Sequence, residues 1–143
     1  MTKENTISFA VPPTIEQSLT CVRSYWEGLR RGENSVPFWD DVDLSSLASL
    51  ADDVLLLDAF DSPWRFRFAL VGKRVAAEYG GSLTGKFLDE LEQRAPLKEL
   101  DAQCSFAAEH RTPAYSSSGG ISRLVLPLWG EGRVSMLLVA TAE

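Results

Sequence analysis

Two segments of the chain have residue spacings typical of ligand-binding loops. Residues 80–86 read Gly-Gly-Ser-Leu-Thr-Gly-Lys, the G-x-x-x-x-G-K pattern of a phosphate-binding loop. Phe87 replaces the Ser or Thr that would reach Mg²⁺, so we interpret these glycines as helix-ending and turn residues. Aspartates between residues 41 and 52 are spaced partly like a calcium loop, but Ser46 stands where that loop needs glycine. We therefore interpret Asp43 as a helix cap.

Few side chains in this sequence could act as nucleophiles, acids or bases. His110 is the only histidine, which excludes a multi-histidine metal site, and helical phase places it opposite the apolar face of its helix. Cys104 lies on that apolar face and is interpreted as a core residue. The serines at 116–118 lack the G-x-S-x-G elbow of a hydrolase nucleophile. We predict no catalytic residue and no metal site.

Arg123 is the charged residue with the strongest indication of a role. Alternation along its predicted strand places it on one face with Ile121, Val125 and Pro127. An arginine among apolar neighbours needs an anionic partner. The sequence leaves two partners open, a carboxylate of the same chain or the carboxylate or phosphate of a ligand.

Composition narrows the classes of function. The 143 residues are enough for one domain with a real core, and the formal net charge of -6 argues against nucleic acid and anionic membranes as partners. No apolar run of 18 residues is present, so no transmembrane helix is expected. The isolated Cys21 and Cys104, and the lack of a signal-peptide pattern, favour the cytoplasm.

Tight turns define the elements that must position Arg123. Asp61-Ser62-Pro63, Gly119-Gly120 and Gly130-Glu131-Gly132 each separate two strand-like runs. The predicted strands are 54–60, 64–71, 114–118, 121–129 and 133–141, and the predicted helices between the second and third are near 74–79, 86–91 and 96–110. Two strands, several helices and three strands predict an α+β fold with an antiparallel sheet and helices across one face.

The helices and the sheet should enclose a small pocket. Strand alternation and helical phase supply its expected lining, which is Phe66, Phe68, Tyr79, Cys104, Tyr115, Arg123 and Val125.

The N-terminal region is predicted as a flexible arm (1–12) followed by one domain (13–143) with a helix at 14–31 and a core at 36–142. That helix carries an apolar stripe in steps of four and three, formed by Ile15, Leu19, Val22, Trp26 and Leu29. The stripe either covers a face of its own sheet or also forms a seam between two chains. We expect a homodimer through this helix and the apolar sheet face of Leu124, Leu126 and Leu128.

An ordered set of residues resembles a PAS-like family of small, mostly uncharacterised proteins common in proteobacteria. The set covers nearly the whole chain after residue 14 and consists of Tyr25-Trp26-x-x-Leu29-Arg30, Pro37, Asp43, Leu70-Val71-Gly72, Gly80, Leu83-Thr84-Gly85-Lys86, Leu91 and Arg123-Leu-Val-Leu-Pro127-Leu128. The resemblance implies the PAS architecture, a five-stranded antiparallel sheet with helices across one face and an N-terminal helix outside the core. It carries no catalytic residues.

The resemblance also implies what this chain lacks. Nothing matches the Asn-Cys-Arg-Phe-Leu-Gln stretch of flavin-binding relatives. Haem-binding relatives direct a histidine of the long helix into the pocket, whereas His110 is expected to face away. We therefore expect no cofactor, and leave open a small-molecule ligand of unknown identity.

Three functions are compatible with these observations. The first is a ligand-sensing or regulatory module without catalysis, acting through a signalling partner or a dimer. The second is a structural dimerisation module with a filled core. The third is a small enzyme of the isomerase or dehydratase type on a cone-shaped α+β fold, which would need an Asp or His inside the cone.

Overall fold

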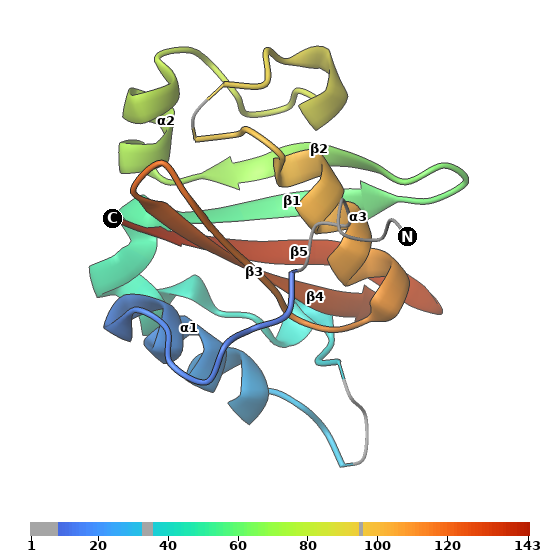
Figure 1. The fold of residues 1–143 in the computed structure, drawn as a ribbon. Helices are drawn as coiled ribbons and strands as arrows, with labels where there is room; N and C mark the ends of the chain where they lie inside the picture. Colours follow the sequence, from blue (N-terminus) through green and yellow to red (C-terminus); the bar gives the residue numbers. More distant parts are fainter. Residues whose placement is uncertain (1–8, 33–35, 95) are drawn as a thin grey trace, which may run out of the picture.

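The computed structural model describes residues 9–32, 36–94 and 96–143 (Figure 1). Its helices, where η marks a 3-10 helix, are α1 (Gln17–Gly28), η2 (Trp39–Asp41), η3 (Leu44–Asp53), α2 (Lys73–Tyr79), η4 (Leu88–Glu90) and α3 (Leu100–His110). Its strands are β1 (Val54–Phe60), β2 (Arg65–Val71), β3 (Ala114–Ser118), β4 (Ile121–Gly130) and β5 (Arg133–Ala142). The predicted strands are thus present with nearly the predicted ends.

The strands form one antiparallel sheet in the order β2-β1-β5-β4-β3. The predicted tight turns join β1 to β2, β3 to β4 and β4 to β5, and each joined pair lies side by side. Pairing of β1 with β5, for example Leu57 with Leu137, joins the first hairpin to the last three strands. The predicted α+β fold with a five-stranded antiparallel sheet is therefore confirmed.

One face of the sheet, here called the inner face, packs against α2, α3 and the segment between them. Alternate residues of the strands point to this side, as the pleat requires. With Leu88, Leu97 and Leu100 from the covering segments they form a core that includes Leu55, Leu57, Phe66, Phe68, Cys104, Val125, Leu137 and Val139.

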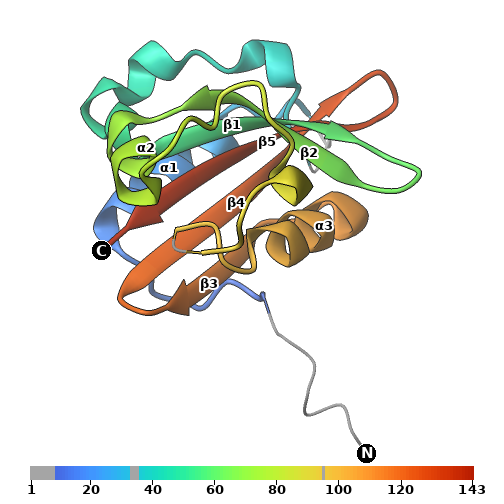
Figure 2. The ribbon, with the colours of Figure 1, turned by 90° about the horizontal axis from the view of Figure 1, so that it is seen from above.

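The opposite, outer face packs against α1 and η3, so α1 and α3 lie on opposite sides of the sheet (Figure 2). Leu19, Val22 and Trp26 of α1 are buried against Leu124 and Leu126 of the same chain. Trp26 also donates its indole N–H to the carbonyl of Pro127 at 2.8 Å. A sheet that is apolar on both faces thus receives two covers from one chain.

Two predicted boundaries at the N-terminus differ from the structure. Helix α1 is shorter than the predicted 14–31, and its first turn has no side-chain cap. Phe9 falls within the predicted flexible arm, but it is buried in the inner core, where its ring contacts that of Phe106 at 5.5 Å between centroids. An aromatic ring that fills a core position fixes the backbone around it. The predicted arm at 1–8 lies outside the described residues.

The long helix also begins later than predicted, at Leu100 rather than at Pro96. Residues 96–99 form turns instead, with amide-to-carbonyl bonds from Leu97 to Arg94 (2.7 Å) and from Leu100 to Leu97 (2.9 Å). Glu99 has a left-handed backbone with φ of 64°, which a continuous helix cannot contain.

Segments outside the sheet bond to its two edge strands. On β3, the amide of Tyr115 donates to the carbonyl of Phe9 at 2.8 Å. On β2, the amide of Phe68 donates to the carbonyl of Lys86 at 2.9 Å, and its carbonyl accepts from the amide of Gly85 at 2.8 Å. Both edges therefore have a neighbouring chain segment.

Strand β4 is longer than β3, so its second half needs a different neighbour. The β3 pairing ends at Val125. Beyond that point, Pro127 has no amide hydrogen to satisfy and its carbonyl accepts from Trp26, while the amide of Trp129 donates to the carbonyl of Pro37 at 2.8 Å. A proline is thus tolerated in a long strand because it occupies an unpaired stretch of the edge.

Candidate functional site

Arg123 is a buried cation at the β3–β4 end of the sheet. Only 6 % of its surface is exposed. Its guanidinium donates from Nε to Oε1 of Gln103 at 2.6 Å, from Nη1 to the carbonyl of Pro96 at 2.8 Å and from Nη2 to the carbonyl of Lys98 at 3.0 Å. Within the described residues it forms no ion pair, so the internal salt bridge that the sequence left open is not formed there.

Gln103 holds this guanidinium in place. The side chain is fully buried, and its amide donates to the carbonyls of Ala114 (3.0 Å) and Arg123 (2.9 Å). These bonds orient Oε1, which accepts from Arg123 and from the hydroxyl of Ser116 at 3.0 Å. All four hydrogen-bonding positions of the amide are used. Gln103 was missed at the sequence level, although it lies between Leu100 and Ala107 on the apolar face of α3, a position where a polar residue signals a buried network.

The delayed start of α3 supplies the two carbonyls that Arg123 uses. In a helix beginning at Pro96, the carbonyls of Pro96 and Lys98 would accept from amides four residues later. Turns at 96–99 leave both carbonyls free to face β4. The local unwinding and the buried arginine therefore depend on each other.

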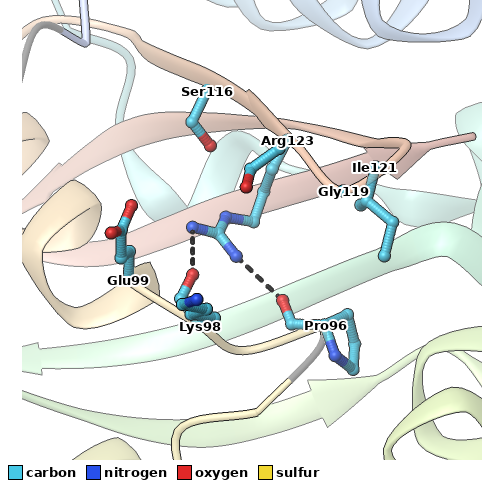
Figure 3. A pocket seen from close by; sticks show the side chains of 8 residues that line it. Pro96, Lys98, Glu99, Ser116, Gly119, Ile121 and Arg123 are labelled. Atoms are coloured by element: carbon cyan, nitrogen blue, oxygen red, sulfur yellow. Dashed lines mark hydrogen bonds between the residues drawn. The ribbon is translucent and has the colours of Figure 1, made fainter.

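A cavity of about 180 Å³ lies beside this network. Figure 3 shows the guanidinium of Arg123 between strand β4 and the turn at 96–98, with its bonds to the two carbonyls. The lining combines two cationic side chains, one carboxylate, hydroxyls and apolar groups, from Arg123, Lys98, Glu99, Ser116, Ser118, Gly119, Pro96 and Ile121. The cavity thus lies between the N-terminal end of α3 and the β3–β4 hairpin.

Burial controls the electrostatics of the site. Loss of hydration lowers the pKa of the Arg123 guanidinium, while the Cys104 thiol and the Glu99 carboxylate act in the opposite direction. Burial also raises the pKa of the Cys104 thiol well above its usual range. Cys104 therefore stays a neutral core residue, as its position on the apolar face predicted.

The expected pocket lining divides into three groups. Phe66, Phe68, Tyr79, Cys104 and Val125 are brought together, but as tightly buried parts of the inner core. Arg123 lies at the cavity beside that core.

Tyr115 is on the wrong face for the expected pocket. Its cross-strand partner is Leu124, and paired residues of neighbouring strands share a face. Both therefore belong to the outer side, where the hydroxyl of Tyr115 donates to a carboxylate oxygen of Glu16 at 3.1 Å and lies 3.2 Å from the hydroxyl of Ser122. Ser122 also donates to Glu16, directly before α1.

The stripe on the N-terminal helix lies on its own sheet. Leu19, Val22 and Trp26 are buried there, while Ile15 precedes α1 and Leu29 follows it, both half-buried. The second half of the outer face is less covered. A groove of about 220 Å³ lies there, lined by Trp39, Asp58, Ala59, Phe60, Arg67, Glu131, Arg133, Ser135 and Met136.

The loop patterns in the sequence are structural features. Gly80 ends α2 with φ of 80°, and Gly85 turns toward β2 with φ of 85°. Asp43 caps η3 by accepting from the amide of Ser45 at 3.1 Å. His110 is exposed beside Phe106. In the part of the chain that the structure describes, no three His, Cys, Asp or Glu side chains lie close enough to hold a metal, and no helix is long and apolar enough to cross a membrane.

Comparison with known proteins agrees with this architecture. No curated protein and no solved structure gives a significant match. The family model for the PAS domain matches residues 15–139, from the approach to α1 through the middle of β5. This match covers most of the chain, and the observed five-stranded antiparallel sheet agrees with it. The chain therefore belongs to the PAS domain family.

Proposed function

We propose that this protein is a ligand-sensing or regulatory PAS module that has no catalysis of its own and acts through a protein partner or a second copy of itself. The observation that carries the proposal is the cavity beside Arg123, a pre-oriented cation on the helix-covered side of a PAS sheet. Family membership supports a sensory rather than a catalytic role. The alternative of a small isomerase or dehydratase required a cone-shaped fold, whereas the chain matches the PAS domain family.

The β3–β4 hairpin offers a route from this cavity to the outer face. Arg123 points to the inner side, and its neighbour Ser122 points to the outer side and donates to Glu16 at the start of α1. The same arrangement occurs on β3. Ser116 points to the inner side and donates to Gln103, and its neighbour Tyr115 points to the outer side and donates to Glu16. A ligand that shifts this hairpin would change the contacts that hold α1.

Native mass spectrometry of the intact protein tests the proposal without knowledge of the ligand. The protein should be purified under non-denaturing conditions from the organism that encodes it. We expect a second species heavier than the chain by the mass of a small molecule, and loss of that mass on denaturation. A single mass equal to the bare chain in every preparation would contradict ligand sensing.

The second candidate is a structural dimerisation module, and two observations favour it. Phe66 and Phe68 are 1 % exposed and Cys104 is fully buried, so these side chains of the inner core are closed off from solvent. Trp39 is 48 % exposed at the rim of the outer-face groove, where a second chain could cover it.

The free thiols of Cys21 and Cys104 support the proposed cytoplasmic location.

A further inference from the structure

Arg123 forms no ion pair in the described part of the chain. All three observed acceptors are neutral, being two backbone carbonyls and an amide oxygen. Buried charges are normally paired, because burying an isolated ion is costly. Lys98 adds a second cation to the cavity lining, and Glu99 supplies the one carboxylate. At neutral pH the lining therefore carries a net charge of about +1, counted over these three side chains.

The guanidinium also has unused donors. Arginine has five N–H groups, of which Nε, Nη1 and Nη2 use one each in the observed bonds. Within the described residues, one N–H on Nη1 and one on Nη2 remain. A hydrogen bond from a guanidinium N–H to a carboxylate oxygen is charge-assisted and stronger than one to a neutral acceptor. The two unused donors are therefore available to a carboxylate in the cavity that Arg123 lines.

Size and lining restrict the rest of the ligand. A volume of about 180 Å³ is comparable to an engineered cavity of about 150 Å³ that holds benzene. Pro96 and Ile121 offer apolar contact, and Ser116 and Ser118 offer hydroxyls. The net charge of about +1 favours a monoanion over a phosphate dianion, which Glu99 would repel.

We propose that this cavity binds a small organic monocarboxylate, with the carboxylate on the free donors of Arg123 and the short carbon chain against Pro96 and Ile121. The assignment rests on the proposed sensing function and names the class of its ligand. Gln103 is a positioning residue here, because it holds the guanidinium without reaching the ligand through its own donors.

Matched pairs of acids and amides test the assignment in titrations followed by calorimetry and thermal shift. Propionate, butyrate, isobutyrate and benzoate would each be compared with the corresponding primary amide at constant ionic strength, with sodium phosphate as the inorganic anion. At least one acid should bind about tenfold or more tightly than its amide, since a hydrogen bond to a charged group is worth about 1.5–3 kcal/mol.

Three variants separate the cavity from non-specific anion binding. Ile121→Trp occupies the cavity and leaves every hydrogen-bonding residue of the Arg123 network in the chain, so it should abolish the acid-dependent shift in melting temperature while the protein stays folded. Glu99→Gln removes the competing carboxylate and should tighten acid binding. Glu109→Gln makes the same charge change at an exposed position on α3 outside the lining and should leave acid binding unchanged.

The outcomes distinguish this assignment from the proposed function. Equal binding of acids and amides, stronger binding of phosphate, or unchanged acid binding in Ile121→Trp would overturn the monocarboxylate. If native mass spectrometry then still showed a retained molecule, ligand sensing would stand with a different class of ligand. A bare chain together with no acid binding would overturn both.

Discussion

At the scale of single residues, the candidate site depends on Gln103, which holds the guanidinium of Arg123 in place. Arg123 alone would be a costly buried charge, because its hydration is lost and it forms no ion pair within the described chain. Gln103 reduces that cost with one oxygen and ties the same arginine to α3, β3 and β4. The network is fully satisfied on the glutamine side, and a satisfied buried network is rigid.

Replacing Gln103 should therefore cost far more than replacing an exposed glutamine. Gln103→Leu keeps the approximate volume but removes the acceptor of the Arg123 Nε–H and of the Ser116 hydroxyl. We expect the free energy of unfolding to fall by about 3 kcal/mol, since each unsatisfied buried group costs about 1–3 kcal/mol. Chemical denaturation measures this loss. Gln17→Leu, on the exposed side of α1, should change it by less than about 0.5 kcal/mol. Equal losses in the two variants would show that the network is not a stabilising unit.

Glu16 gives the outer side of the hairpin a pH dependence. The hydroxyl of Ser122 donates to this carboxylate and, with a smaller contribution from Tyr115, holds the pKa of Glu16 below its ordinary value. A carboxyl with a lowered pKa stabilises the fold fully above its unfolded value, about 4.3, and loses that contribution as the pH falls through its folded value.

Glu16→Gln should consequently be less stable than the wild type at pH 7, with a difference that shrinks on acidification below about pH 4.3. Urea denaturation at a series of pH values measures it. Ser122→Ala removes the strongest donor and should reproduce the same trend. A deficit that is as large at pH 3 as at pH 7 would mean that the Glu16 carboxylate is not stabilised by this contact.

At the scale of elements, close backbone approach fixes the junction between β2, α2 and η3. Gly72 lies directly before α2, and its amide donates to the carbonyl of Val54 at 2.9 Å. A Cβ at this position would lie 2.6 Å from the carbonyl oxygen of Ala51 and closer still to that of Asp52. Glycine is needed here because η3 passes directly beside it, and its backbone φ of −66° is ordinary.

Gly72→Ala should accordingly destabilise the fold by about 1–3 kcal/mol, the usual cost of an inserted methyl group in a packed site. Gly28→Ala is the matched control, because Gly28 ends α1 and a methyl group added to it would meet no atom within 4 Å. That variant should be as stable as the wild type or slightly more stable. Thermal unfolding of both proteins measures the difference. Similar melting temperatures would contradict the tight junction.

Local patterns in the sequence were sufficient for most elements. The turns at Gly119-Gly120 and Gly130-Glu131-Gly132 and the alternation around them predicted the last three strands almost to the residue. The start of α3 could not be predicted in this way. Pro96 is a good first helical residue, but its carbonyl bonds Arg123, 27 positions away, instead of the helix. Tertiary contacts decided that boundary.

The candidate site was predictable only in part for the same reason. Arg123 stood out as a cation among apolar neighbours, and its position on the inner face followed from strand alternation. The face of Tyr115 depends on the register between β3 and β4, which pairs it with Leu124. A short strand that is polar on both sides carries no signal for that register. The cavity follows from the turns at 96–99, which local propensity did not indicate.

At the scale of the whole molecule, the position of α1 changes the expected dimer. The stripe of Leu19, Val22 and Trp26 is buried on its own sheet and leaves the groove beside Trp39 as the less covered part of the outer face. We expect a homodimer that covers this groove at tens of micromolar. Trp39→Ser should shift it toward monomer without unfolding, since the indole is 48 % exposed. Sedimentation equilibrium measures both proteins. A monomeric wild type at these concentrations would exclude the dimer.

The segments that lie along β2, β3 and the second half of β4 have a consequence for how copies of this chain can meet. Unpaired edge strands are templates for adding further strands, which is how sheets grow into fibrils or capture extended peptides. Here Lys86, Phe9 and Pro37 already occupy backbone groups of those strands, and Pro127 removes a donor from the remaining stretch. Growth of the sheet by strand addition is therefore blocked where these segments lie. Association is directed to the flat sides of the molecule, where side chains rather than backbone decide which partner fits.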